Sequence, residues 1–186
     1  MKKILSSKFF DRGVLAVCPE LLGKYLVINR GWKEVWFMIT EIEAYDGQED
    51  LACHARFGKT DRNAVMFGHP EHWYVYLCYG MYWMLNIVTG PWKHPSAILI
   101  RAVKSSTLKG TPSFIKEDKL DGPGKITKNL WIDKRFNWKK ADKKSWLRIE
   151  DRWVIVKRYK TDKRIGVDYA GRWAKKKWRF ILVNSQ

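Results

Sequence analysis

The chain has 186 residues, a length typical of one globular domain that can bury a core of its own. Hydrophobic residues make up 46% of it, which excludes a disordered chain. Lys and Arg number 36 against 19 Asp and Glu, giving a formal net charge of +17. Such a surplus attracts polyanions, so nucleic acid is the first partner class indicated and an anionic membrane surface the second.

The positive charge is concentrated towards the C-terminus. Residues 134–186 hold 18 basic and 5 acidic side chains, a balance of +13. This segment is either a footprint on phosphates or a solvated face. Three cysteines without paired spacing fit a reducing compartment, so we expect a cytoplasmic protein. The N-terminus is not a secretory signal, and no apolar stretch is long enough to predict a membrane helix.

The N-terminal segment is predicted to form a helix over residues 9–25, in one or two pieces. Asp11 is the expected N-cap, Pro19 should kink or restart the helix, and Gly23 should end it. Two strands, 25–30 and 35–43, are predicted to follow, joined at Arg30-Gly31.

The second of these strands overlaps residues 36–45, where a row of apolar residues ends in two carboxylates and a tyrosine. Alternation predicts that Phe37, Ile39, Glu41, Glu43 and Tyr45 share one side. The strand end is either simply exposed to solvent or carries a general base at the mouth of a pocket.

Residues 46–72 form a long polar segment, and such a segment in a compact domain is often functional. Lys59 and Arg62 are candidate phosphate contacts, whereas a structural or exposed role is the default for His54. Two cysteines and three histidines lie here or just beyond and are an alternative candidate zinc site, since His69 and His72 have a plausible ligand spacing. They are Cys53, His54, His69, His72 and Cys78.

Residues 73–89 are predicted to form a β-hairpin that turns at Gly80. Tyr74, Tyr76 and Cys78 should share one face of its first strand. At the tip, Tyr79 and Met81 are either packing residues or a wedge that inserts between stacked bases.

The next strand is predicted over residues 97–103, where Arg101 should share a face with Leu99 and Val103. An arginine in a buried strand usually pairs with a carboxylate. Glu41 and Glu43 fit equally well from the sequence.

Residues 104–124 are predicted to be loop-like, followed by a helix through Leu130. The segment Asp121-Gly122-Pro123-Gly124-Lys125 is either a backbone-phosphate contact or a plain turn, and it lacks the spacing of a nucleotide triphosphate site. Further strands are predicted over 153–156 and 180–183.

These motifs together resemble the alkyladenine (3-methyladenine) DNA glycosylase family of the non-helix-hairpin-helix type. The match extends over nearly the whole chain. It includes Thr40-Glu41-Ile42-Glu43-Ala44-Tyr45, His54, Tyr74 to Tyr82 with Asn86, Leu99-Ile100-Arg101-Ala102, Asp121 to Lys125 and Arg164 to Gly171. The resemblance implies a single α+β domain spanning residues 1–186, with a curved antiparallel sheet, flanking helices and a protruding hairpin.

The resemblance also implies a role for each candidate residue. Glu43 matches the general base and Arg101 a partner of the catalytic water, which the backbone near Ile165 would also hold. Tyr79, with Met81 beside it, matches the intercalating wedge. The base pocket would be formed by Tyr45, His54, Tyr76, Asn86 and Ile165. The contacts to the DNA backbone would come from Lys59, Arg62, Gly122, Gly124 and Lys125.

The function implied is a monofunctional glycosylase of base excision repair. It would flip alkylated or deaminated purines out of duplex DNA and hydrolyse the glycosidic bond with a Glu-activated water, leaving an abasic site. No metal or cofactor is expected, and the protein should act as a cytoplasmic, nucleoid-associated monomer on damaged double-stranded DNA. The alternative is a non-catalytic nucleic-acid-binding module that uses its basic face and aromatic stacking.

Overall fold

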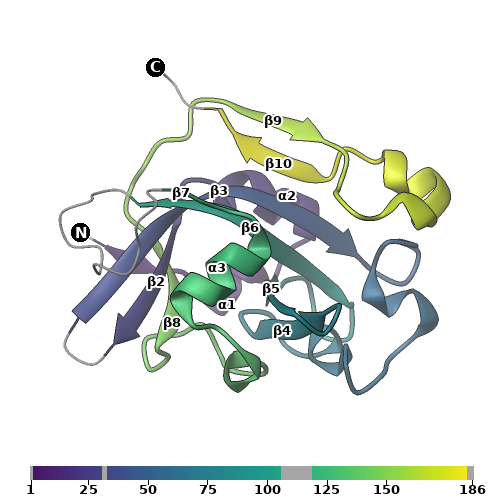
Figure 1. Cartoon of the computed structure of the whole chain (residues 1–186), viewed down its shortest axis with the longest axis horizontal. Coiled ribbons are helices and arrows are strands. Elements are labelled where there is room, and N and C mark those ends of the chain that lie inside the picture. Colours follow the sequence, from purple (N-terminus) through teal and green to yellow (C-terminus); the bar gives the residue numbers. More distant parts are fainter. Residues whose placement is uncertain (1, 31–32, 106–118, 184–186) are drawn as a thin grey trace.

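The computed structural model describes residues 2–30, 33–105 and 119–183 and has an α+β architecture (Figure 1). All the strand pairs in its ten-stranded sheet are antiparallel. None of the helices in these ranges is long and apolar enough to cross a membrane. The main path of the sheet runs β1-β8-β2-β3-β6-β5-β4. The strands on this path are β1 (Lys3–Ile4), β2 (Tyr25–Arg30), β3 (Lys33–Asp46), β4 (Trp73–Cys78), β5 (Tyr82–Val88), β6 (Ser96–Ser105) and β8 (Leu147–Asp151).

Three shorter strands lie off this path. β7 (Lys119–Asp121) pairs with β6, and β10 (Arg179–Leu182) pairs with both β3 and β9 (Tyr159–Asp162). In Figure 1 the β9–β10 pair lies above the rest of the sheet. The predicted strand over 180–183 is thus confirmed at β10. The strand predicted over 153–156 is wrong, because the pairing ends at Asp151 and this segment has no regular structure.

β3 is the longest strand and the centre of the sheet. Its first half pairs with β2, and residues 41–43 pair with β10, while β6 lies along its other edge. The pairing with β6 is irregular around Glu41: Ile39 pairs with Val103, but Ile42 pairs with Ile100. Along each strand these two pairs are three residues apart. Residues three apart on a regular strand face opposite sides of the sheet, yet here both pairs face the core. The irregularity therefore reverses which alternate side chains face the core.

This irregularity corrects the predicted strand faces. Phe37 and Ile39 lie in the core with Ile42 and Ala44, not with Glu41, Glu43 and Tyr45. On β6, Val103 lies in the same core, whereas Leu99 and Arg101 line a cavity on the opposite side of the strand. The sheet thereby keeps its apolar core unbroken and turns its charged side chains to the other face.

The N-terminal helix forms in two pieces, α1 (Ser7–Phe10) and α2 (Val14–Leu21). The break falls at residues 11–13, since α2 continues through Pro19. Asp11 ends α1, and Gly13 is the N-cap of α2, so the N-cap predicted at Asp11 is wrong. Gly23 follows α2 with a φ of 78°, as expected of a helix stop. α2 packs against β3 and β6.

The remaining helices position the loops around the sheet. α3 (Pro123–Leu130) packs against β5 and β6, and β7 with α3 replaces part of the loop predicted over 104–124. Residues 106–118 of that prediction lie outside the described residues. Four 3-10 helices complete the described parts of the chain: η1 (His54–Phe57), η2 (Ala64–Phe67), η3 (Lys134–Phe136) and η4 (Asp168–Lys175).

The predicted hairpin is confirmed as β4 and β5. Tyr74 pairs with Asn86, and Tyr76 pairs with Met84. The N–H of Met81 donates to the carbonyl of Cys78, closing a turn in which Tyr79 and Gly80 both have positive φ, 50° and 68°. Turns with two positive φ angles match the twist of a hairpin, and glycine accommodates the second at little cost.

Candidate active site

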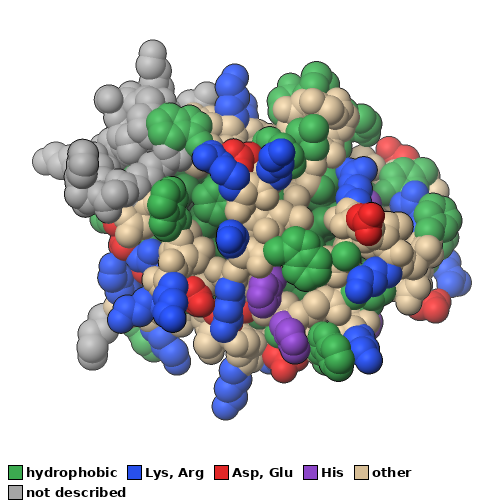
Figure 2. Space-filling model, turned by 90° about the horizontal axis from the view of Figure 1, so that it is seen from below, with side chains coloured by type: hydrophobic (Ala, Val, Ile, Leu, Met, Phe, Trp, Pro, Cys, Tyr) green, Lys and Arg blue, Asp and Glu red, His purple; other side chains and the backbone are tan. Residues whose placement is uncertain are grey.

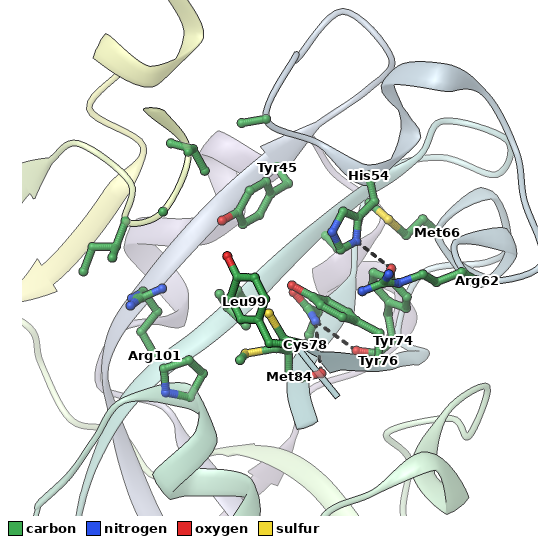
Figure 3. Close-up of a pocket in the computed structure, with 18 of the residues that line it drawn as sticks. Tyr45, His54, Arg62, Met66, Tyr74, Tyr76, Cys78, Met84, Leu99 and Arg101 are labelled. Atoms are coloured by element: carbon green, nitrogen blue, oxygen red, sulfur yellow. Dashed lines mark hydrogen bonds between the residues drawn. The ribbon is translucent and has the colours of Figure 1, made fainter. Parts of the chain in front are cut away.

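A cavity of about 460 Å³ opens where the C-terminal half of β3, the hairpin, β6 and the loop before η4 come together. Figure 3 shows the rings of Tyr45, His54 and Tyr76 facing one common space, with Arg101 on the side away from His54. Asn86, Ile165 and Tyr79 also line the cavity. The structure therefore brings together candidates that lie far apart in the sequence.

Glu43 is fully buried directly behind the wall of this cavity. Its Oε2 accepts hydrogen bonds from the Tyr45 hydroxyl (2.9 Å) and from Nη1 of Arg101 (3.2 Å). Its Oε1 accepts one from the backbone N–H of Ile165 (2.8 Å). All three donors belong to residues that line the cavity. An ionised carboxylate has about four acceptor positions, so these donors leave about one position open.

Burial raises the pKa of Glu43 above its ordinary value. Arg101, the N–H of Ile165 and the Tyr45 hydroxyl act in the opposite direction, because each stabilises the charged form. A carboxyl group that is buried yet surrounded by donors is poised to take up a proton without losing its place. Such perturbed groups beside a cavity are typical of catalytic sites.

Arg101 is shared between the two carboxylates that the sequence could not separate. Its Nη1 lies 3.2 Å from Oε2 of Glu43, and its Nε lies 3.6 Å from Oε1 of Glu41. Glu41 is also paired with Arg179 on β10, at 3.1 Å. Glu41 is thus paired with two arginines, whereas all three donors to Glu43 belong to residues that line the cavity.

The loop carrying Ile165 is held in place by a buried ion pair between Arg164 and Asp50. The two side chains are completely buried, and the guanidinium donates to both carboxylate oxygens at 2.6 and 2.8 Å. It also donates to the carbonyl of Ala44 (2.9 Å) and lies about 5 Å from the ring centres of Tyr45 and Trp178. Neither partner was predicted from the sequence: Arg164 lies in a motif that supports the family resemblance, whereas no pattern pointed to Asp50.

The aromatic wall opposite Arg101 is held together by a ring contact and a hydrogen bond. The rings of His54 and Tyr76 meet edge to face with centres 4.6 Å apart, and Nδ1 of His54 lies 2.8 Å from the Tyr74 hydroxyl. Burial and the nearby cations Arg62 and Arg56 lower the pKa of His54 to about 4. His54 is therefore neutral at pH 7. Burial raises the pKa of Tyr76, so its phenol is neutral as well.

The hairpin supplies one wall of the cavity and its most exposed aromatic. The amide nitrogen of Asn86 donates to the carbonyls of Tyr74 (3.0 Å) and Met84 (3.3 Å), which fixes the side chain in the wall. At the tip, Tyr79 is 87% exposed and Met81 is 67% exposed. Tyr79 also lines the cavity, so a large ring stands in solvent directly beside the opening.

The candidate contacts to the DNA backbone differ in whether their donor groups are exposed or already engaged within the protein. Arg62 is exposed at the edge of the cavity, 5.1 Å from the Tyr76 ring centre, and Lys59 and Lys125 are exposed. The N–H of Gly122 already donates to the carbonyl of Arg101 (2.9 Å). At Gly124 a Cβ would lie 2.8 Å from the Tyr82 ring, so this glycine has a packing role.

Among the described residues, no three His, Cys, Asp or Glu side chains are grouped so that they could hold a metal ion. His54 bonds to Tyr74, and Nδ1 of His72 lies 3.0 Å from the carbonyl of His69. Cys53 is fully buried, and burial raises its pKa to about 12. Three members of the alternative zinc site, His54, His72 and Cys53, therefore have other partners or are buried.

Comparisons with known proteins identify the family. The sequence model of methylpurine-DNA glycosylase (MPG) matches residues 8–186. A relative from Methanocella arvoryzae is 42% identical over 188 residues, which cover 98% of this chain and 94% of the relative. A relative from Legionella pneumophila strain Paris is 40% identical, covering 100% and 97%, and one from Ehrlichia ruminantium strain Gardel is 41% identical, covering 99% and 92%. All three are provisionally named 3-methyladenine DNA glycosylase. The chain therefore belongs to the methylpurine-DNA glycosylase family and is a hydrolase that acts on DNA, as a glycosylase of the 3-methyladenine type.

Proposed function

We propose that this protein flips alkylated or deaminated purines into the cavity between Tyr45, His54 and Tyr76, the first cavity, and hydrolyses their glycosidic bonds with a water activated by Glu43. The observation that carries the proposal is the buried carboxylate behind the aromatic cavity, with three donors and a raised pKa. Burying a carboxylate costs stability unless the charge is compensated. A protein that only binds nucleic acid does not need such a buried carboxylate.

In this mechanism the water hydrogen-bonds to the acceptor position that remains on Glu43. The water oxygen forms a bond to C1′ of the sugar, the glycosidic bond breaks, and its electron pair leaves with the base. Glu43 accepts the proton from the water. Its negative charge also stabilises the positive charge that develops on the sugar. Arg101 and the N–H of Ile165 hold the carboxylate in place throughout.

The cavity walls suit an electron-poor purine. Tyr45 and Tyr76 line the cavity, and the negative face of a tyrosine ring attracts a cationic or electron-poor base. Neutral His54 adds no positive charge that would repel such a base. Asn86, fixed between two carbonyls, is positioned to crowd the exocyclic amine of normal guanine.

We propose that Tyr79, assisted by Met81, fills the gap that the flipped nucleotide leaves in the duplex. The proposed contacts to the DNA backbone are the side chains of Lys59, Arg62 and Lys125 and the backbone N–H of Gly124 in the first turn of α3. Gly122 is not included, because its amide is already paired. We further propose that the protein acts as a monomer and leaves an abasic site without cutting the strand.

Single-turnover base release tests the proposal. The substrates are a duplex containing one hypoxanthine and, separately, methylated DNA, with the wild type beside Glu43→Gln. We expect release by the wild type and a loss of about 10³-fold in the variant, because a general base contributes about 10²- to 10⁴-fold. Binding to damaged duplex should change little.

Glu41→Gln is the matched control, since it neutralises a carboxylate two residues away that also pairs with Arg101. Equal activity of the wild type and Glu43→Gln would refute the mechanism. Tight lesion binding without any release by the wild type would favour the non-catalytic module.

A further inference from the structure

A second cavity, of about 760 Å³, lies at the other end of α3. Its walls come from the end of β2, from the residue that follows α3, and from the segment 135–146. The segment 131–146 lies at the lower edge of Figure 1, and Figure 2 views the molecule from that side. The side chains that matter are three aromatic and three cationic residues: Trp131, Phe136, Trp146, Arg135, Lys139 and Lys144.

The two tryptophans of this cavity are unusually exposed. Trp146 is 72% exposed and Trp131 is 55% exposed, although an indole ring usually buries most of its surface. Exposed apolar side chains gathered at a hollow are typical of a binding site. This cavity therefore has the features of a surface that a partner covers.

The cations indicate the charge of that partner. No Asp or Glu side chain described in the structure is part of the cavity lining. Arg135 is compensated by Asp133, at 2.8 Å, but Lys139 and Lys144 are exposed and make no ion pair with a described residue. Figure 2 shows Lys and Arg side chains crowding parts of this face, with hydrophobic side chains exposed between them. The cavity is thus complementary to an anion that carries an aromatic group.

The position of the cavity favours nucleic acid over an acidic peptide. Pro123, at the start of α3, lines the first cavity, and Trp131, directly after α3, lines the second. A helix rises about 1.5 Å per residue, so about 12 Å separates the two residues, the length of three to four base steps. Lys125 and Lys128 are exposed on α3 between them. DNA held at the first cavity can therefore extend to the second.

We propose that the second cavity binds an unpaired nucleotide of a DNA strand. Its base stacks on Trp146 and Trp131, and its phosphates pair with Lys139 and Lys144. A base inside an intact duplex cannot reach such a hollow, since both of its faces are stacked, so the ligand is single-stranded or extrahelical. The proposal depends on the DNA-acting family of the chain and is independent of the role proposed for Glu43.

Fluorescence anisotropy tests this with two fluorescein-labelled probes, single-stranded (dT)8 and an undamaged blunt duplex. Stacking on one aromatic contributes about 5- to 150-fold in affinity. We expect Trp146→Ala to weaken binding of (dT)8 at least fivefold and binding of the duplex less than twofold. Trp153→Ala is the matched control: this tryptophan is 63% exposed and lies outside the cavity, so both affinities should be kept.

A lysine pair tests the same site without disturbing its packing. Lys139→Gln with Lys144→Gln should lower the slope of log affinity against log salt by about 1.4 for (dT)8, at about 0.7 per phosphate contact. The exposed pair Lys157→Gln with Lys160→Gln is the control and should affect both probes alike.

Unchanged (dT)8 binding in either cavity variant overturns the proposal, as do equal losses on both probes. An acidic, phenylalanine-containing peptide that competes at this cavity where (dT)8 does not would assign the site to a protein partner and also overturn it. Base release from a blunt duplex, measured on the same preparations, reports on Glu43 separately, so the two proposals can fail independently.

Discussion

An arginine–aspartate ion pair lies beside each of the two cavities, but the two pairs are in opposite environments. Behind the first, Arg164 and Asp50 are completely buried and are linked by two hydrogen bonds. At the edge of the second, the Arg135 and Asp133 side chains are 74% and 30% exposed. The first pair holds a backbone loop whose N–H reaches Glu43, whereas the second is local, since its partners are two residues apart.

This difference indicates what each cavity can do. The walls of the first are fixed by hydrogen bonds, ring contacts and a buried ion pair, as chemistry on a precisely placed bond requires. The second has exposed aromatics and lysines that make no ion pair with a described residue, so it is suited to binding without catalysis. Rigidity and a compensated buried charge distinguish the two sites better than their aromatic content does.

The sharpest test of this contrast replaces one aspartate at each cavity. We expect Asp50→Asn to lower the free energy of unfolding by about 3–5 kcal/mol, because it leaves the Arg164 charge buried and unpaired. Asp133→Asn should have a far smaller effect, because solvent screens an exposed pair. Urea unfolding at pH 7 measures both, and equal losses would contradict the contrast.

Asp50→Asn should also affect the chemistry. Loss of the ion pair frees the loop that places the Ile165 N–H against Glu43, so the pKa of Glu43 should rise further. The acid side of the pH–rate profile would then move to higher pH at a temperature where the variant is folded. A purely structural role for the pair would lower the amount of folded enzyme without moving the profile.

The next largest effect is expected at the hairpin tip, which has no counterpart among the residues that line the second cavity. Tyr79→Ala should weaken capture of a hypoxanthine-containing duplex about 10- to 100-fold, because unstacking a base costs a few kcal/mol and the ring offsets part of it. Binding to undamaged duplex should fall much less.

Tyr159→Ala, on β9 and outside the lining of both cavities, is the control for loss of an exposed tyrosine. Equal losses on damaged and undamaged duplex would make Tyr79 a general contact and not a wedge. The comparison is made by competition between the two duplexes at one salt concentration.

The sequence predicted the features that depend on neighbouring residues. Alternation around a glycine predicted the hairpin, and the glycine-proline segment predicted the start of α3. The change of strand face beyond Ile39 could not be predicted, because it depends on the irregular pairing of β3 with β6, more than 55 residues away. The strand predicted over 153–156 failed because its apolar residues have no partner strand in the described sheet.

The site was predicted to the extent that its residues lie in recognisable motifs. Glu43, Arg101 and the aromatic wall come together as the family resemblance implied. The Arg164–Asp50 pair joins residues 114 positions apart, and no periodicity or spacing in a single sequence indicates such a contact. The second cavity was missed for the same reason, since it combines the end of β2 with a segment more than 100 residues later.

The smallest expected effect separates the roles of two titratable groups, Glu43 behind the wall of the first cavity and His54 in that wall. The proposed mechanism requires Glu43 to be ionised, so at subsaturating substrate the rate of base release should rise with pH through the pKa of Glu43. Burial raises this pKa, which places the rise above the ordinary glutamate value of about 4.3. His54, with a pKa of about 4, is already neutral there.

His54→Asn should therefore lower the rate without moving the acid side of the pH–rate profile. Arg101→Ala removes a cation that stabilises the carboxylate of Glu43, so it should move the acid side to higher pH. A profile that moves with His54→Asn and not with Arg101→Ala would transfer the role of base from Glu43 to His54.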